Sequence, residues 1–284
     1  MKETKNTKKS VVIILSITSD IGFNLAKNYL ADGFFVVGTY RTYSSKIRQL
    51  KQFPCAILKC DAANNRSITS FIHKLKTLNL TWDVCISCIG EPRPLTAFFK
   101  TNFDDWLASV NVNSFQQLRI VHALYETRST EKTSTVVFFA GGGINKSVVN
   151  FSAYTIGKII LIKMCEYLDA ENSDLNIFIV GPGWTKTKTH QLILNDTSIS
   201  KEKRLETIAF LQSKSGTDTD YIYECIARLV SAKKIVSGRN FSIVYDPLQK
   251  NKFVDLMGQL KQNPDLFKLR RYERKSNEIP QNHR

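Results

Sequence analysis

Long apolar runs are missing from this sequence, and none reaches the ~20 consecutive residues that a helix needs to cross a bilayer. Lys8 and Lys9, followed by an apolar run from Val11 to Ile17, are similar to the start of a secretion signal, but no small-residue cleavage site comes next. Internal repeats and low-complexity linkers are also missing. These absences predict a cytoplasmic protein with one main domain and no membrane segment.

The sequence also lacks the second pair of ligands that a zinc site built on cysteines requires. Cys85 and Cys88 have CxxC spacing, but they stand at the end of a predicted strand and no further pair accompanies them. The six cysteines lie mostly in apolar runs, where a free thiol behaves as a small hydrophobic group. We therefore expect no metal, and we interpret the cysteines as packing residues in a reducing compartment.

Acidic residues are scarce relative to basic ones, since 25 Asp and Glu stand against 40 Lys and Arg and give a net charge of +15. Such a charge suits a polyanionic partner, whether nucleic acid, an anionic membrane surface or a phosphorylated substrate. The basic residues are nevertheless spread along the chain, with local enrichment at 2–9 and 250–275 and without interleaved aromatic residues on one face. The pattern predicts a solvated basic surface, with neither nucleic acid nor a membrane as partner.

Short runs of β-branched and aromatic residues alternate with longer stretches of helical period. This alternation is typical of an α/β fold, a Rossmann-like doubly wound parallel β-sheet with helices on both faces. We divide the chain into a flexible basic N-terminus (1–10), a Rossmann-fold domain (11–248) and a C-terminal helical extension with a basic tail (249–284). The predicted strands run from Val11 to Ser16, Phe34 to Thr39, Ala56 to Lys59, Val84 to Ser87, Thr135 to Ala140, Asn176 to Val180 and Phe241 to Val244.

The turn after the first predicted strand is a candidate phosphate site, because a doubly wound sheet binds ligands at the carboxyl ends of its strands and the following helix offers its N-terminus to a pyrophosphate. Asp20 is predicted to cap this helix, and Asp32 and Gly33 to end it. Tyr40 and Arg41 end the second strand, where an NAD site places a carboxylate that would repel a 2′-phosphate and arginine would attract it. This predicts NADP as the cofactor, with NAD as the weaker alternative; Arg41 is also open to interpretation as a solvated surface residue.

Tyr154 and Lys158, four positions apart, are predicted to lie beside each other on one face of a helix. A phenol with its ordinary pKa near 10 is a poor base at neutral pH, and a neighbouring ammonium is expected to lower that pKa. The pair follows a predicted strand and the glycine loop 141–143. It therefore predicts a proton-transfer site.

These features together resemble the short-chain dehydrogenase/reductase family. Tyr154 to Lys158 matches the family's YxxxK motif, and Ser16 to Gly22 is similar to its TGxxxGIG turn, with Ser16 and Asp20 in place of two glycines. The chain is identified as a divergent member of this family. Further matches follow in the family's order: Asp61-Ala62 after the third strand, Ser87-Cys88-Ile89-Gly90 in place of NNAG, Asn111 in a later helix, and Pro182 to Thr187 in place of PGxxxT.

The resemblance implies an NAD(P)-dependent oxidoreductase, with NADP favoured, that moves a hydride between the cofactor and a small-molecule carbonyl or alcohol. Tyr154 would be the general acid/base, Lys158 would lower its pKa and bind the nicotinamide ribose, and Asn111 would hold a water of the proton relay. The basic surface adds the expectation of an anionic substrate such as a sugar nucleotide, and the family implies a homodimer or homotetramer. The implied cofactor-binding residues are Ser16, Thr18, Ser19, Asp20, Ile21, Tyr40, Arg41, Asp61, Ala62, Ser87, Cys88, Gly90, Tyr154, Lys158, Pro182, Gly183, Thr185 and Thr187.

One departure from the family affects the chemistry. The family's catalytic serine falls at Ala140 or Gly141, and neither residue has a hydroxyl. Removing one preorganised donor costs on the order of 10² to 10³ in rate unless another group replaces it, and the amides of 141–143 and Ser147 are the candidates. The alternative function is a low-turnover NADP-binding pseudoenzyme that acts as a sensor or as a partner subunit.

Overall fold

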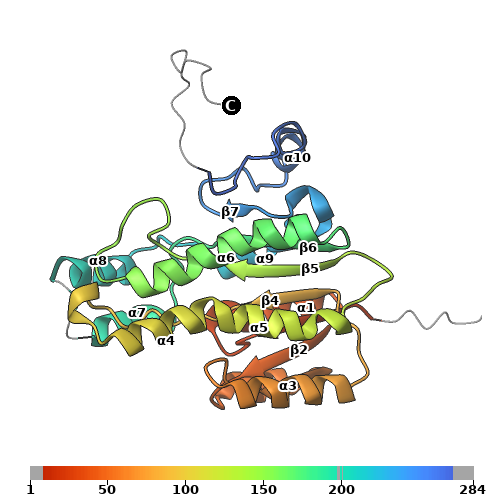
Figure 1. The fold of residues 1–284 in the computed structure, drawn as a ribbon, viewed down its shortest axis with the longest axis horizontal. Helices are drawn as coiled ribbons and strands as arrows, with labels where there is room; N and C mark the ends of the chain where they lie inside the picture. The colour runs from red at the N-terminus through yellow and green to blue at the C-terminus, as the bar shows by residue number, and fades with distance from the viewer. Residues whose placement is uncertain (1–8, 197–198, 200, 271–284) are drawn as a thin grey trace, which may run out of the picture.

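The computed structural model describes residues 9–196, 199 and 201–270. Within this part of the chain the strands form one parallel sheet in the order β3-β2-β1-β4-β5-β6-β7 (Figure 1). Val12 of β1 is in register with Val36 of β2 on one side and with Val84 of β4 on the other, so the strand order reverses at β1. The strands are β1 (Val11–Leu15), β2 (Phe35–Tyr40), β3 (Cys55–Lys59), β4 (Val84–Ser87), β5 (Ser134–Phe139), β6 (Leu175–Gly181) and β7 (Asn240–Ser242).

Alternate residues of the strands face opposite helical layers. Val12 and Ile14 of β1 belong to one apolar core with α1, α9 and α10, whereas Ile13 and Leu15 belong to another with α3, α5 and α6. The sheet is therefore covered on both faces, as predicted for a doubly wound fold. The helices are α1 (Asp20–Ala31), α2 (Ser45–Leu50), α3 (Asn65–Thr77), α4 (Phe103–Asn113), α5 (Phe115–Leu124), α6 (Ser152–Glu171), α7 (Lys188–Asn195), α8 (Lys201–Gln212), α9 (Thr219–Ser231) and α10 (Phe253–Gln262), with short 3-10 turns at Phe98–Lys100, Tyr125–Thr127 and Lys233–Val236.

The first crossover helix is capped one residue earlier than predicted. Ser19 is the N-cap of α1, and its hydroxyl accepts a hydrogen bond from the N–H of Gly22 (3.0 Å), so Asp20 is the first helical residue. The predicted cap at Asp20 is wrong because serine and aspartate serve equally well as caps and stand next to each other. The other end of the helix is as predicted, with Asp32 as the C-cap and Gly33 at a φ of +83°.

The last described helix, α10, lies in the predicted C-terminal extension. Its Leu256 and Leu260 are buried in the same core as α1 and α9. The predicted flexible N-terminus, apart from residues 9 and 10, and the basic tail from residue 271 lie outside the described residues. None of the described helices is both long and apolar enough to span a membrane.

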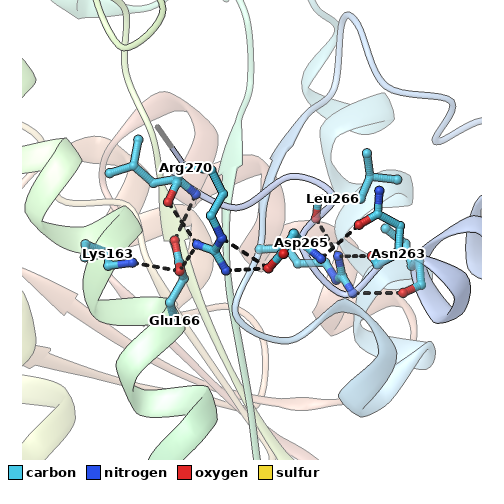
Figure 2. Close-up of polar contacts among 9 residues, drawn as sticks. Lys163, Glu166, Asn263, Asp265, Leu266 and Arg270 are labelled. Atoms are coloured by element: carbon cyan, nitrogen blue, oxygen red, sulfur yellow. Dashed lines mark hydrogen bonds and ion pairs between the residues drawn. The ribbon is translucent and has the colours of Figure 1, made fainter. Parts of the chain in front are cut away.

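The segment after α10 is fastened to α6 by ion pairs (Figure 2). Arg270 donates to Asp265 (2.7 Å) and to Glu166 of α6 (2.6 Å). Glu166 also accepts from Lys163 on its own helix (2.9 Å) and from the backbone N–H of Leu269 (2.9 Å). The segment is thereby held against the body of the domain.

The same segment covers the outer edge of β7. The N–H of Asn240 donates to the carbonyl of Phe267 (2.8 Å), whereas the carbonyl of Arg239 accepts from Ile179 of β6 (3.0 Å). The C=O of Arg239 and the N–H of Asn240 belong to one peptide group and point in opposite directions, so the bond to Phe267 lies on the side away from β6.

Candidate active site

A cleft of about 720 Å³ lies at the carboxyl ends of the strands, where the strand order reverses. Its volume is typical of a cofactor or small-molecule site, and its position is where doubly wound sheets bind ligands. The predicted cofactor residues that line it are Ser16, Thr18, Arg41, Asp61, Ala62 and Gly90. The predicted residues that lie outside its lining are Ser19, Asp20, Ile21, Tyr40, Ser87, Cys88, Tyr154, Lys158, Pro182, Gly183, Thr185 and Thr187.

The turn after β1 has a left-handed residue at the position of the family's first glycine. Ser16 has a φ of +61°, a region that side-chain-bearing residues adopt at a cost. Its N–H donates to the hydroxyl of Thr39 on β2 (2.9 Å), and its carbonyl accepts from the N–H of Ser19 (3.0 Å). These bonds hold the turn in shape although the glycine is lost.

Asp20, at the position of the second glycine, brings a carboxylate to the N-terminus of α1. Its Oδ1 lies 2.5 Å from the ammonium of Lys46, and its Oδ2 accepts from the backbone N–H of Lys188 (2.6 Å). Burial acts to raise the pKa of Asp20, but the hydrogen bonds from these two lysines outweigh it and lower that pKa. A negative charge is therefore fixed beside the turn.

The chain after β2 contributes a cation to the cleft. Arg41 is exposed and lines the cleft, and neither it nor Tyr40 is acidic. Glu91, which also lines the cleft, forms a two-point ion pair with Arg93 (2.8 and 3.0 Å). Burial acts to raise the pKa of Glu91, but Arg93 lowers it and Arg41 adds a smaller lowering effect.

Helix α6 directs Tyr154 and Lys158 towards the loop after β4. Lys158 is 1 % exposed, and its Nζ donates to the carbonyl of Ile89 (3.0 Å) and lies 5.6 Å from the centre of the Tyr154 ring. Tyr154 is half-buried, and its ring lies 3.8 Å from where a Cβ on Gly90 would stand. Since Gly90 lines the cleft, one edge of the Tyr154 ring adjoins the cleft.

Burial acts on these two groups in opposite directions. It raises the pKa of Tyr154 to about 12 and lowers that of Lys158 to about 8. The pKa of Tyr154 thus moves opposite to the direction that the YxxxK spacing predicts, because burial disfavours the phenolate. At neutral pH the phenol is protonated, which suits it to donate a proton rather than to accept one.

The ring of Tyr154 fills the space of the missing serine side chain. A Cβ on Gly141 would stand 2.6 Å from the phenol oxygen and 2.7 Å from Cζ, so no side chain fits there without moving the ring. Ala140, the other candidate for the serine position, is 4 % exposed and belongs to the core shared with α3, α5 and α6. Ser147, four residues beyond the glycine loop, is exposed. Thr155 fastens the glycine loop to α6 by donating its hydroxyl to the carbonyl of Gly142 (3.1 Å).

An asparagine that the sequence analysis missed braces the loop after β4. Asn113 is fully buried, and its side chain accepts from the N–H of Glu91 (3.0 Å) and donates to the carbonyl of the same residue (2.8 Å). Its Cβ lies 2.7 Å from where a Cβ on Gly157 would stand, so the glycine lets α4 and α6 approach closely. Asn111, predicted for the relay, makes no side-chain hydrogen bond among the described residues. Asn111 and Asn113 are two positions apart in α4, so their side chains leave different faces of the helix. The sequence alone does not indicate which of the two faces meets the loop.

A second brace joins α5 to the same loop. Ser87 donates to the side-chain oxygen of Gln117 (2.7 Å), and the amide nitrogen of Gln117 lies 3.4 Å from the Ile89 carbonyl that also accepts from Lys158. Ser87 and Gln117 are fully buried. A buried glutamine on the apolar face of a helix was the available signal for this role. Cys88, between the braced residues, is a free thiol whose pKa burial raises, which fits a packing role.

The chain after β6 passes through Pro182 and Gly183 to α7. Thr185 is 6 % exposed, and its hydroxyl has no hydrogen-bond partner among the described residues. Thr187 caps α7 in a reciprocal pair with His190. The hydroxyl of Thr185 is thus a buried polar group without a partner among the described residues, and it lies outside the lining of the cleft.

The comparisons with known proteins agree with this geometry. The sequence matches the family model described as enoyl-(acyl carrier protein) reductase over residues 17–243. The chain belongs to the short-chain dehydrogenase/reductase family, whose members are oxidoreductases that generally depend on NAD(P). A search of curated proteins finds no match.

Several solved structures share the fold. A short-chain dehydrogenase/reductase from Saccharomyces cerevisiae has a TM-score of 0.77 and 17% identity, with 85% of this chain and 98% of that chain covered. The KRED1-Pglu enzyme has a TM-score of 0.74 and 17% identity, covering 82% and 100%. An actinorhodin polyketide ketoreductase with NADPH has a TM-score of 0.71 and 18% identity, covering 82% and 95%. At these identities the likeness establishes the fold alone.

Proposed function

We propose that this protein is an NADP-dependent reductase of a carbonyl substrate, with Tyr154 as the proton donor. The observation that carries the proposal is the position of Tyr154, whose ring edge adjoins the cleft beside Gly90 and whose ring centre lies 5.6 Å from the buried ammonium of Lys158. The nicotinamide cofactor supplies the hydride when it is bound. The chain itself supplies binding, orientation and a proton.

The proton is held at the phenol oxygen of Tyr154, which donates it to the substrate oxygen as the carbonyl is reduced. Lys158 is fixed by its bond to the Ile89 carbonyl, so its positive charge stands near the phenolate that this donation leaves. Asn113 and Gln117 hold the backbone of residues 89–91, so we assign both a bracing role, and the relay role of Asn111 stays a prediction.

The residues at the ends of β2 and β3 fit a dinucleotide that carries a 2′-phosphate. Arg41 is a cation at the end of β2, and Asp61 is a polar group at the end of β3, both in the lining of the cleft. The buried hydroxyl of Thr185, which has no hydrogen-bond partner among the described residues, follows β6. Arg41 and Asp61 therefore support a dinucleotide site over the ends of β2 and β3.

The cofactor preference is tested by fluorescence titration. We expect NADPH to bind at least about tenfold tighter than NADH, and Arg41→Ala to weaken NADPH by about tenfold while NADH changes by less than about twofold. Arg48→Ala, which removes an exposed arginine from α2, is the matched control and should leave both affinities unchanged. Equal affinities in the unaltered protein would contradict the assignment of NADP.

A cofactor-binding protein with little turnover is the second candidate. It is favoured by Gly141, because the ring of Tyr154 occupies the space of the family's serine and leaves that donor unreplaced by a side chain. NADPH consumption with a panel of neutral and anionic ketones and aldehydes separates the two. Tight NADPH binding without consumption across the panel would establish the second candidate.

The cleft offers no further cation to the expected anionic substrate, because Arg41 is assigned to the cofactor and Arg93 is paired with Glu91. Its charged lining holds more carboxylates than guanidinium groups, so the +15 net charge of the chain is not concentrated there. We therefore propose no sugar nucleotide. The charged lining residues are Arg41, Arg93, Asp61, Glu91, Asp105 and Asp196.

We also propose that the protein self-associates through α4 and α6. Leu107 of α4 and Ile156 of α6 are exposed apolar residues, and Phe103 at the start of α4 is 58 % exposed. Sedimentation velocity should give a dimer or tetramer, and Leu107→Glu should shift it towards the monomer. A monomer at micromolar concentration would contradict this proposal.

A further inference from the structure

We propose that Asp20 is a resident anion that limits cofactor affinity and holds α7 against the phosphate-binding turn. This inference rests on the proposed NADP function, because it concerns the place where the pyrophosphate of a dinucleotide would bind. Asp20 is the first residue of α1, at the helix N-terminus that follows β1. In a doubly wound sheet that N-terminus receives the pyrophosphate.

The first part of the argument is charge. The N–H groups at the start of a helix favour an anion, and here the chain supplies one of its own. Lys46 balances it, with its Nζ 2.5 Å from Oδ1 of Asp20 and 3.2 Å from the carbonyl of Thr18, a cleft residue. Both side chains are largely buried, with 17 % of Lys46 and 25 % of Asp20 exposed, so solvent screens the pair only in part. A pyrophosphate arriving at this turn would meet a carboxylate and a lysine that is already engaged.

The second part is a link between distant parts of the chain. The Oδ2 of Asp20 accepts from the N–H of Lys188 (2.6 Å), the first residue of α7, across 168 positions of sequence. The first N–H groups of a helix lack partners within that helix, and Thr187 already caps α7 from its own side. Asp20 therefore places its negative charge at the N-terminus of α1 and accepts a hydrogen bond from the N-terminus of α7. It joins the turn after β1 to the chain that leaves β6.

The two parts predict different effects for two substitutions. Asp20→Asn removes the charge but keeps an oxygen that accepts from Lys188, whereas Asp20→Ala removes both. Loss of the charge should tighten NADPH binding by about tenfold at low salt for either variant, and by less at high salt, because screening weakens the repulsion. Loss of the acceptor should release α7 in the alanine variant alone.

Two measurements on the full chain test this. Fluorescence titration gives the NADPH affinity, with Lys46→Met expected to weaken it by about tenfold and Asp255→Ala, which removes an aspartate from the first turn of α10, expected to leave it unchanged. Hydrogen exchange measured without cofactor should be at least about fivefold faster over Lys188–Asn195 in Asp20→Ala, and unchanged in Asp20→Asn and Asp255→Ala.

The outcomes are distinguishable from failure of the proposed function. If the unaltered protein binds neither NADPH nor NADH, the cofactor assignment fails, and the link to α7 is decided by the exchange rates alone. If NADPH binds and both Asp20 variants bind it equally or more weakly, the resident-anion role is overturned. If exchange over α7 is the same in Asp20→Ala and in the unaltered protein, the link is overturned.

Discussion

Ionisable groups are stabilised in opposite forms in two regions of the candidate active site, helix α6 and the turn after β1. On α6, Lys158 is buried with the Ile89 carbonyl as its acceptor. Burial lowers the pKa of Lys158 and raises that of Tyr154, which favours the neutral form of each group. At the turn after β1, Asp20 is surrounded by donors and keeps its negative charge. Burial of Tyr154 and Lys158 therefore disfavours their charged forms and costs stability. At the turn, by contrast, the charge of Asp20 is balanced by Lys46 and by the N–H of Lys188.

The largest effect should come from removing the phenol oxygen. Tyr154→Phe should lower NADPH-dependent carbonyl reduction by about 10² to 10⁴, the range for one general acid, while NADPH affinity changes little. Tyr167→Phe, an exposed tyrosine of the same helix, is the control and should keep full activity. Steady-state kinetics decide the matter, and activity that survives in the Tyr154 variant would refute the assigned proton donor.

A methyl group on Gly141 should disturb the same end by contact. Its Cβ would stand 2.6 Å from the Tyr154 oxygen, so Gly141→Ala should displace the ring, lower activity by at least about tenfold and lower the free energy of unfolding by about 1 to 3 kcal/mol. Gly142→Ala is the matched control, because no atom lies within 4 Å of the added Cβ. Equal behaviour of the two variants in activity assays and urea unfolding would show that the ring does not occupy this space.

Removing the buried charge should stabilise the fold. Burial lowers the pKa of Lys158 from 10.5 to about 8, so the folded state carries the ammonium at a cost at pH 7. Because Lys158→Met also removes the bond to the Ile89 carbonyl, it should raise the free energy of unfolding by only about 1 to 3 kcal/mol. Activity should be lost with the ammonium. Lys74→Met, at an exposed lysine of α3, should change the free energy of unfolding by less than about 0.5 kcal/mol.

The pH dependence of that gain has a definite sign. Below about pH 8 the folded and unfolded chains both carry the Lys158 proton, so the folded state bears the whole penalty. Between about pH 8 and 10.5 the folded state releases a proton that the unfolded chain still binds, so this contribution to stability rises with pH. The advantage of Lys158→Met in urea unfolding should therefore shrink between pH 7 and pH 9.5, and a constant advantage would contradict the lowered pKa.

The smallest effect belongs to the turn. Ser16 has a φ of +61°, so Ser16→Gly should raise the free energy of unfolding by about 0.5 to 1 kcal/mol. Ser44→Gly, at a φ of −148° where glycine brings no relief, should be neutral or slightly destabilising. Thermal or urea unfolding of the two variants provides the comparison, and destabilisation by Ser16→Gly would mean that the serine hydroxyl matters more than the backbone.

Much of the fold could be predicted because the strands are buried on both faces. Such strands read as continuous runs of β-branched and aromatic residues, and each predicted strand lies within two residues of an observed one at either end. The choice between Ser19 and Asp20 as the cap could not be made, since both are good caps.

The site was predicted less completely, because its chemistry depends on packing between distant residues. The face of α4 that meets the β4 loop distinguishes Asn113 from Asn111, and composition does not reveal it. The contact between Asp20 and Lys188 joins residues 168 positions apart. The pKa of Tyr154 moves in the direction set by burial, which the YxxxK spacing alone does not report.

The bond between Asn240 and Phe267 has a consequence for how the molecule behaves in a crowded solution. An uncovered outer strand is a template onto which another chain can add a strand, and such growth leads to aggregates. At β7 the template is partly occupied by residues that follow α10, and the pairs of Glu166 and Asp265 with Arg270 keep those residues in place. By covering part of this edge, the C-terminal segment should hinder another chain from adding a strand to β7.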